Sequence, residues 1–277
     1  MNHEEGPHPR GIQAVAAMFA QTKREGRAAF LPYFPVGYPN YEDSISILQS
    51  LAEAGADGIE IGIPFSDPLA DGPTVQAATQ IALEAGTTVE SAFRAVEAMR
   101  AHGHQLPLFL MSYLNPLLSY GPHEFVQKAS DVGADGLIIP DLPPEEADTF
   151  ITLCELAELA LVFFLAPTSD DVRIQLVSER ARGFIYVVSL TGTTGARAAL
   201  PNDLACLIER LRPRCAQPLV LGFGISNAEQ ASQLDGLVDG FIVGSAMIAA
   251  AKQSQAAVRQ FTQQIVQRSH GERLRQG

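Results

Sequence analysis

Two acidic residues in the first quarter of the chain have the types and the spacing that acid/base chemistry requires. Glu60 interrupts an apolar run in which Ile59 and Ile61 form one face of a predicted strand, so its carboxyl group lies on the opposite face. Asp71 follows in the loop after that strand, before Pro73 starts a helix. A carboxyl group on a strand and another on the loop that the strand feeds form a common acid/base arrangement.

Each acid also has a structural explanation. Glu60 could form a buried ion pair with an Arg or Lys, because burial of a bare carboxylate is costly. Asp71 could cap the helix that begins near Pro73. Gly58 and Gly62 favour a functional interpretation of Glu60, because they leave room beside the carboxyl group, as a ligand would require.

The elements that must position these acids alternate regularly along the chain. Strands are predicted over residues 29–34, 59–63, 106–113, 135–140, 161–166, 184–189, 219–222 and 240–243. Helices are predicted over residues 12–23, 41–54, 74–102 with a division at Gly86, 122–132, 144–159, 170–181, 202–211, 227–234, 245–252 and 256–267. Strands this apolar on both faces belong to a buried parallel sheet.

Eight strand–helix units predict an α/β fold, a (β/α)8 TIM barrel with an extra N-terminal helix and a C-terminal helix. We expect one barrel domain over residues 11–268, a disordered tail over 1–10 and a polar tail over 269–277. A short repeat marks three helix-to-strand turns, at residues 55–59 (Gly-Ala-Asp-Gly-Ile), 133–137 (Gly-Ala-Asp-Gly-Leu) and 238–241 (Val-Asp-Gly-Phe). A doubly wound open sheet is the alternative, but the first strand is not followed by its Gly-x-Gly-x-x-Gly turn.

Composition excludes several classes of partner. The net charge of -12 argues against nucleic acid and against an anionic membrane surface. The N-terminus does not resemble a signal peptide and no apolar run has membrane-spanning length, so we expect a cytoplasmic protein. Three cysteines without Cys-x-x-Cys spacing indicate neither a disulfide framework nor a zinc site.

Glycine-rich turns gather at the edge of the predicted barrel where active sites lie, the carboxyl ends of the strands. They follow the last three strands, at residues 191–195, 222–225 and 244–246. Each glycine alone is most simply a turn residue. Three such turns on one rim favour a phosphate site in which backbone N–H groups hold the anion.

The remaining residues narrow the chemistry. Lys23, Lys128 and Lys252 all lie on predicted helices, so no strand offers an amine for a covalent imine. No histidine–carboxylate cluster stands at a strand end, so we expect no metal. Tyr33 and Tyr186 are typical core aromatics, yet at the same rim they would also fit a planar apolar substrate. With an imine and a metal both excluded, the sequence favours carboxylate acid/base catalysis on a phosphorylated substrate.

Residues 60–72 (Glu-Ile-Gly-Ile-Pro-Phe-Ser-Asp-Pro-Leu-Ala-Asp-Gly) resemble the signature of the tryptophan synthase α chain family. The resemblance extends from about residue 12 to residue 252. It includes residues 113–116 (Tyr-Leu-Asn-Pro), 140–143 (Pro-Asp-Leu-Pro), 191–195, 222–226 and 244–245. It implies a barrel that cleaves indole-3-glycerol phosphate to indole and glyceraldehyde 3-phosphate without a metal or organic cofactor of its own.

The resemblance also implies roles for individual residues. Glu60 would move protons between the glycerol hydroxyl and indole C3, and Asp71 would accept the indole N–H and stabilise the positive charge on the protonated ring. The family's phosphate-binding positions are matched by Thr194, Gly195, Gly224, Gly244 and Ser245. Tyr33 and Tyr186 match its substrate-flanking wall.

The family works with a β chain, which implies an α2β2 heterotetramer in which the β chain carries pyridoxal phosphate and turns indole into tryptophan. The positions that match this contact are Pro64, Asp67, Pro68, Asn115 and Pro143. Two residues depart from the family pattern, Tyr38 where an aspartate is usual and Leu190 where an arginine often stands. Both departures lie in segments involved in loop closure and subunit communication.

Three other functions stay open. The chain could be a stand-alone lyase that releases indole, or an inactive barrel that only activates a β partner. It could also be a sugar-phosphate isomerase, since the fold alone does not determine function. The intact pair of Glu60 and Asp71 argues against the inactive barrel, and the long signature argues against the isomerase.

Overall fold

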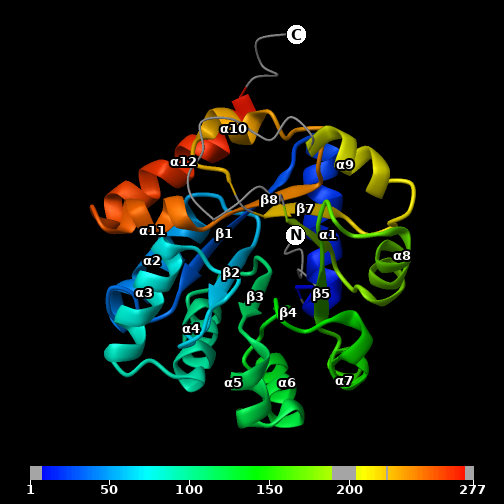
Figure 1. Ribbon diagram of the computed structural model, residues 1–277. Helices are drawn as coiled ribbons and strands as arrows, with labels where there is room; N and C mark the ends of the chain where they lie inside the picture. The colour runs from blue at the N-terminus through cyan, green and yellow to red at the C-terminus, as the bar shows by residue number, and fades with distance from the viewer. Residues whose placement is uncertain (1–7, 189–203, 223, 272–277) are drawn as a thin grey trace, which may run out of the picture.

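A computed structural model describes residues 8–188, 204–222 and 224–271, and these form a closed barrel of eight parallel strands. The strands follow each other around the barrel in chain order and helices surround them (Figure 1). The strands are β1 Ala29–Pro35, β2 Ile59–Gly62, β3 Leu108–Met111, β4 Gly136–Ile138, β5 Ala160–Leu165, β6 Ile185–Val188, β7 Leu219–Gly222 and β8 Gly240–Val243. The predicted TIM barrel is confirmed.

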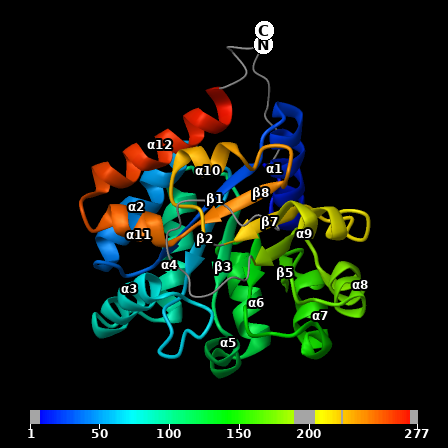
Figure 2. The same ribbon diagram turned by 45° about the horizontal axis from the view of Figure 1, so that its top comes forward.

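The helices are α1 Gly11–Glu25, α2 Tyr41–Glu53, α3 Pro73–Glu84, α4 Val89–Ala101, α5 Leu114–Tyr120, α6 Pro122–Asp131, the 3-10 turn η1 Pro144–Glu146, α7 Asp148–Leu156, α8 Asp171–Arg180, α9 Leu204–Leu211, α10 Ala228–Ser232, α11 Ser245–Ala251 and α12 Gln255–Gly271. The last three pack together on one side of the barrel (Figures 1 and 2). No helix in the described part of the chain is long and apolar enough to cross a membrane.

Local sequence signals explain most of the helix boundaries. Asn40 caps α2 by accepting a hydrogen bond from the backbone N–H of Asp43. Pro73 begins α3 in the first helical turn, where its missing N–H costs nothing. Gly26 ends α1 in the left-handed conformation that favours glycine.

The structure differs from the predicted elements in three places. Helix α5 lies in a segment for which no helix was predicted, because seven residues are too few to show a helical period. The helix expected over 144–159 is divided into η1 and α7 at Ala147. Helix α12 extends to Gly271, so the polar tail expected to begin at 269 is helical over its first three residues. The expected N-terminal tail lies mostly outside the described residues.

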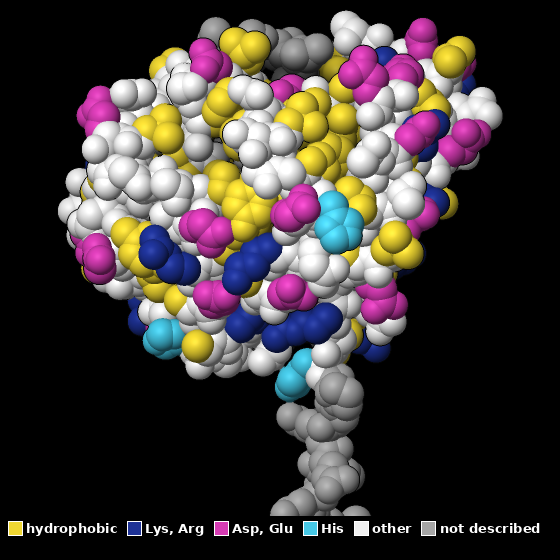
Figure 3. All heavy atoms as spheres, turned by 90° about the horizontal axis from the view of Figure 1, so that it is seen from below, with side chains coloured by type: hydrophobic (Ala, Val, Ile, Leu, Met, Phe, Trp, Pro, Cys, Tyr) yellow, Lys and Arg dark blue, Asp and Glu magenta, His cyan; other side chains and the backbone are white. Residues whose placement is uncertain are grey.

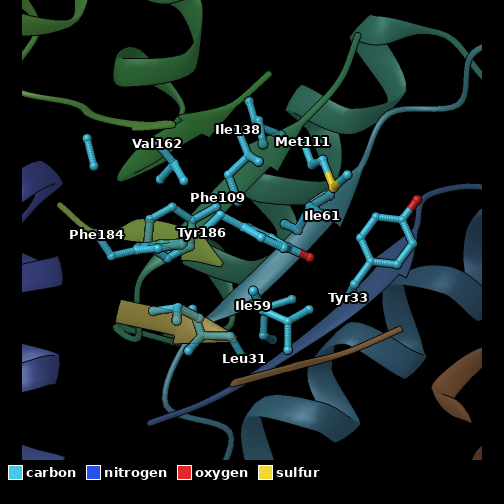
Figure 4. Close-up of a cluster of buried hydrophobic side chains, with 14 of the residues drawn as sticks. Leu31, Tyr33, Ile59, Ile61, Phe109, Met111, Ile138, Val162, Phe184 and Tyr186 are labelled. Atoms are coloured by element: carbon cyan, nitrogen blue, oxygen red, sulfur yellow. The ribbon is translucent and has the colours of Figure 1, made fainter. Parts of the chain in front are cut away.

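Side chains from neighbouring strands meet in register inside the barrel. Tyr33 of β1 is in register with Glu60 of β2, which is in register with Phe109 of β3. Figure 4 shows the aromatic and aliphatic side chains that β1, β2, β3, β4, β5 and β6 contribute to this buried cluster. Register partners on parallel strands face the same side of the sheet, so Glu60 faces the same interior as the two aromatic rings.

The repeated Asp-Gly turns have a common structure at the amino ends of the strands. Each aspartate accepts a hydrogen bond from a backbone N–H at the start of the preceding strand and pairs with an arginine that comes before that strand. The contacts join Asp57 to Phe30 and Arg27, Asp135 to Leu108 and Arg100, and Asp239 to Leu219 and Arg212. The repeat therefore ties adjacent strands together at this end of the barrel.

The first helix is attached at the same end. The backbone N–H of Gly11 donates to Asp135 Oδ1 at 2.7 Å, and the N–H of Ile12 donates to the carbonyl oxygen of Glu158 at 2.8 Å.

The surface seen from below in Figure 3 carries both charged and hydrophobic side chains. Lys and Arg side chains lie beside Asp and Glu in the lower half of the view, and hydrophobic side chains gather in a hollow in the upper half. Charges of both signs are therefore interspersed on this face.

Candidate active site

One cavity at the carboxyl ends of the strands contains most of the predicted catalytic and substrate-binding residues. Its walls come from β1, β2, β3, β6, β8, the loop before α3, the first turn of α3, the segment after β7 and the start of α11. The lining residues are Tyr33, Glu60, Asp71, Gly72, Val75, Met111, Tyr186, Gly224, Ile225, Ser226, Ile242, Gly244, Ser245 and Ala246. Both predicted acids, both predicted tyrosines and three predicted phosphate-binding residues therefore share one space.

Glu60 is buried without a partner. Its side chain is 0% exposed, and neither carboxyl oxygen has a hydrogen-bond partner among the described residues. Burial raises the pKa of Glu60 well above its ordinary value, and the nearby charge of Asp71 raises it further. No Arg or Lys among the described residues pairs with Glu60, so this part of the chain does not support the structural explanation, a buried ion pair.

Asp71 is half-buried, and the hydroxyl of Tyr113 donates a hydrogen bond to Asp71 Oδ2 at 3.1 Å. Burial raises the pKa of Asp71 to about 6, while the hydrogen bond from Tyr113 lowers it. The N-cap of α3 is Gly72, and no side chain caps that helix. The capping role considered for Asp71 is therefore wrong, and its carboxylate lines the cavity.

The two tyrosines of the cavity wall are both buried. Tyr186 stacks on Phe164, with ring centroids 4.7 Å apart, and its hydroxyl points toward the side of the cluster where Tyr33 lies (Figure 4). Burial raises the pKa of Tyr33 and of Tyr186 well above the ordinary value, so both hydroxyls stay protonated. The wall is thus aromatic and uncharged, which suits a flat apolar ring.

The glycines beside Glu60 have a different use from the one expected. A Cβ atom on Gly62 would lie 2.3 Å from the Tyr33 hydroxyl oxygen, so the space above this glycine holds the Tyr33 ring and not a ligand. A Cβ atom on Gly58 would lie 3.2 Å from the sulfur of Met18 on α1. Both glycines allow close packing around the strand that carries Glu60.

The predicted phosphate site is described in part. Gly224 has a φ of 93° and open space where a Cβ atom would stand, and Gly244 precedes α11, which begins at Ser245. Gly244, Ser245 and Ala246 line the cavity at the start of α11, where the N–H groups of a first helical turn have no acceptor within the helix. Thr194 and Gly195 lie outside the described residues, as does Leu190.

The positions expected to contact a partner lie in three segments around the same rim. Pro64 is buried, Pro68 and Pro143 are half-buried, and Asp67 and Asn115 are exposed. Two hydrogen bonds join the segments: the N–H of Ala70 donates to the Tyr113 hydroxyl at 2.9 Å, and the N–H of Leu114 donates to Asp141 Oδ1 at 2.8 Å. Leu69, in the first of these segments, is 92% exposed, which is unusual for a side chain of its size.

Some contacts of the site were not expected from the sequence. Val75 and Ile242 line the cavity, and the periodicity of their elements would have indicated only that they are buried. Tyr113 belongs to one of the motifs of the sequence analysis, but its bond to Asp71 across 42 positions of the chain was not predicted. Among the described residues no group of three or more His, Cys, Asp and Glu side chains could hold a metal ion.

The comparison with protein families gives one match to most of the chain. The model of the family described as "Tryptophan synthase alpha chain" matches residues 19–274. A tryptophan synthase alpha chain from Roseiflexus sp. (strain RS-1) is 45% identical over 237 residues, which cover 86% of this chain and 91% of the relative. One from Chloroflexus aurantiacus is 46% identical over 237 residues, covering 86% and 89%.

Solved structures agree with the sequence relatives. A chain of the tryptophan synthase of Mycobacterium tuberculosis superposes with a TM-score of 0.88 at 35% identity, covering 92% of this chain and 98% of that one. The tryptophan synthase alpha chain of Legionella pneumophila gives a TM-score of 0.85 at 30% identity, covering 94% and 98%. The match in sequence and in fold extends over the whole barrel that carries the cavity. The chain belongs to the tryptophan synthase alpha chain family.

Proposed function

We propose that the chain cleaves indole-3-glycerol phosphate to indole and glyceraldehyde 3-phosphate, with Glu60 and Asp71 as its acid/base residues. As a member of its family the chain is a lyase of tryptophan biosynthesis. The observation that supports the catalytic assignment most strongly is the carboxyl group of Glu60, which is buried without a hydrogen-bond partner among the described residues in the cavity that Asp71 also lines. A buried acid without a partner costs stability, so a function is the simplest reason to keep it.

Glu60 would transfer a proton within the substrate. As a carboxylate it takes the proton of the hydroxyl on the carbon bonded to indole C3, and as an acid it delivers a proton to C3. The bond between these two carbons then breaks, its electron pair returns to the indole ring, and the hydroxyl carbon becomes the aldehyde. A carboxyl group with a raised pKa suits both directions of transfer near neutral pH.

Asp71 would act on the ring nitrogen. Protonation of C3 places positive charge on the indole ring, and a carboxylate that accepts the indole N–H stabilises this charge. With a pKa of about 6, Asp71 is mostly ionised at neutral pH, as this role requires. The two acids thus have different environments and different roles in one cavity.

The remaining cavity residues would bind the two ends of the substrate. Tyr33 and Tyr186 form the aromatic wall for the indole ring. Backbone N–H groups near Gly224, Gly244 and Ser245 would hold the phosphate, together with Thr194 and Gly195. This arrangement places the glycerol carbons between the ring and the phosphate, next to the acids.

A β chain is the partner that we propose for the exposed rim with Asp67, Pro68, Leu69 and Asn115. The solved relatives include structures of tryptophan synthase. An α2β2 assembly with pyridoxal phosphate on the β chain, and a cytoplasmic location, stay predictions. Titration of the chain with a β chain should raise indole production, because loops that order on binding complete such sites. Unchanged turnover would favour a stand-alone lyase.

Substitution of each acid by its amide tests the catalytic assignment. Glu60→Gln and Asp71→Asn should each lower the rate of indole release by about 10²- to 10⁴-fold, because proton transfer and charge stabilisation contribute effects of this size. Glu97→Gln is the matched control, since Glu97 is exposed and pairs with Lys128 on the surface. Turnover near that of the wild type in either amide variant, with a folded protein, would contradict the assignment.

A further inference from the structure

Tyr113 connects the end of β3 to both ends of the segment that follows β2. Its hydroxyl donates to Asp71 Oδ2 at 3.1 Å and accepts the N–H of Ala70 at 2.9 Å. Its ring lies 5.5 Å from the ring of Phe65, at an interplanar angle of 32°. One side chain therefore contacts the beginning and the end of the loop that presents Asp71.

The position of Tyr113 is itself well determined. It is only 5% exposed and occupies the N-cap position of α5. The next residue, Leu114, donates its N–H to Asp141 Oδ1 at 2.8 Å. A buried side chain whose backbone is held at a helix start has little freedom, so it can hold the loop that it contacts.

We propose that Tyr113 is a positioning residue for the cleavage reaction, whose hydroxyl bridges Ala70 and Asp71 and holds Asp71 as a carboxylate aimed into the cavity. This inference rests on the role proposed above for Asp71. Tyr113 does not line the cavity, so it acts through Asp71 and not on the substrate. A phenol is well suited to the task, because it can accept one hydrogen bond and donate another.

The charges around Asp71 explain why one donor matters. The titratable groups that interact with Asp71 come from four strands or strand ends: Tyr33, Glu60, Tyr113 and Tyr186. Asp141 faces Tyr113 from the segment after β4. Burial favours the neutral form of Asp71, and the hydrogen bond from Tyr113 opposes this by lowering the pKa. Burial and Asp71 hold the pKa of Tyr113 far above its ordinary value, so Tyr113 stays a donor.

The test is Tyr113→Phe, which removes the hydroxyl and keeps the ring that packs on Phe65. Loss of a hydrogen bond to a carboxylate should move the acidic limb of the kcat/KM profile for indole release upward by about one pH unit. The variant should therefore lose about fivefold in kcat/KM near pH 6, about tenfold near pH 5, and much less near pH 8.5, where Asp71 is ionised in both proteins.

Tyr120→Phe is the matched control. The Tyr120 hydroxyl also donates to an acid, Glu90, and its ring also packs on a phenylalanine, Phe93, but it lies away from the cavity. Its pH profile should coincide with that of the wild type. A Tyr113→Phe profile that is unchanged would overturn the proposal. So would an equal loss at every pH, because that result would show a structural role without an effect on the ionisation of Asp71.

A second readout does not depend on activity. Titration of the Asp71 carboxyl carbon by ¹³C NMR in the ligand-free protein should give a higher pKa in Tyr113→Phe than in the wild type. An equal pKa in both proteins would overturn the proposal. If the wild type releases no indole while the Asp71 pKa still shifts, then the proposed function fails and the contact between Tyr113 and Asp71 stands.

Discussion

The two ends of the barrel treat buried acids in opposite ways. Asp135 at the amino ends of the strands and Glu60 at the carboxyl ends are both 0% exposed. Asp135 accepts hydrogen bonds from the N–H groups of Gly11 and Leu108 and pairs with Arg100. Glu60 has no hydrogen-bond partner among the described residues. Burial alone therefore does not distinguish the two acids, whereas burial in a cavity without a partner among the described residues makes Glu60 the candidate for catalysis.

The difference corresponds to a division of labour in the fold. At the amino ends, the three Asp-Gly turns fix strand against strand with charged hydrogen bonds. At the carboxyl ends, loops carry the groups that substrate must reach, and satisfying them with protein partners would remove them from chemistry. Stabilising contacts at the amino ends of the strands offset the cost of burying an acid at the carboxyl ends.

The largest expected effect on stability is at the amino end. Asp135→Ala leaves two backbone N–H groups and the guanidinium of Arg100 without their shared acceptor, so it should lower the free energy of unfolding by about 3–5 kcal/mol. Urea denaturation measures the change. Asp131→Ala, at an exposed acid on α6, is the control and should change stability little. A loss of unfolding free energy below about 1 kcal/mol in Asp135→Ala would contradict a stabilising role for Asp135.

An effect of opposite sign is expected at the carboxyl end. Glu60→Gln replaces a buried acid, whose pKa is raised in the folded protein, by a neutral group of the same shape, so it should raise the free energy of unfolding at pH 8 by about 1–3 kcal/mol. The same variant should lose its catalytic activity. Destabilisation by Glu60→Gln would indicate a structural partner for Glu60 and would erase the contrast with Asp135.

The smallest effect is expected at the third Asp-Gly turn. Asp239 pairs with Arg212, but the two side chains are 30% and 42% exposed, so solvent screens the pair. Asp239→Ala should lower the free energy of unfolding by about 1 kcal/mol, mainly through the N–H of Leu219 that loses its acceptor. Urea denaturation of Asp239→Ala and of Asp135→Ala compares the two losses of unfolding free energy. The comparison shows whether burial determines how much the repeated aspartate contact stabilises the fold. Equal losses at the two sites would show that it does not.

The sequence was sufficient for the barrel and for most of the cavity, because both depend on regular patterns. Alternating apolar strands determine the sheet, and the carboxyl ends of parallel strands necessarily share one rim. The shared rim predicts that Glu60, Asp71, Tyr33 and Tyr186 lie close together, and all four line the cavity. The Asp-Gly repeat was visible too, but as turns only.

Contacts between loops were not predictable in the same way. The hydrogen bond between Tyr113 and Asp71 joins residues 42 positions apart. It depends on the conformations of two loops, which hydrophobic periodicity does not predict. The arginines of the Asp-Gly turns come 27 to 35 positions before their aspartates, so only the barrel itself brings them together. The space beside Gly62 was assigned to a ligand, because the sequence does not show that Tyr33 fills it.

The most direct measurement of the central claim is the unfolding free energy of Glu60→Gln relative to wild type between pH 4 and pH 8. The folded protein holds the Glu60 proton more tightly than the unfolded chain does, since the pKa is raised above 4.5. The wild type should therefore lose stability relative to the variant as the pH rises above about 4.5 and through the raised pKa. A stability difference that is constant or shrinks over this range would show that Glu60 is not a buried acid without a partner.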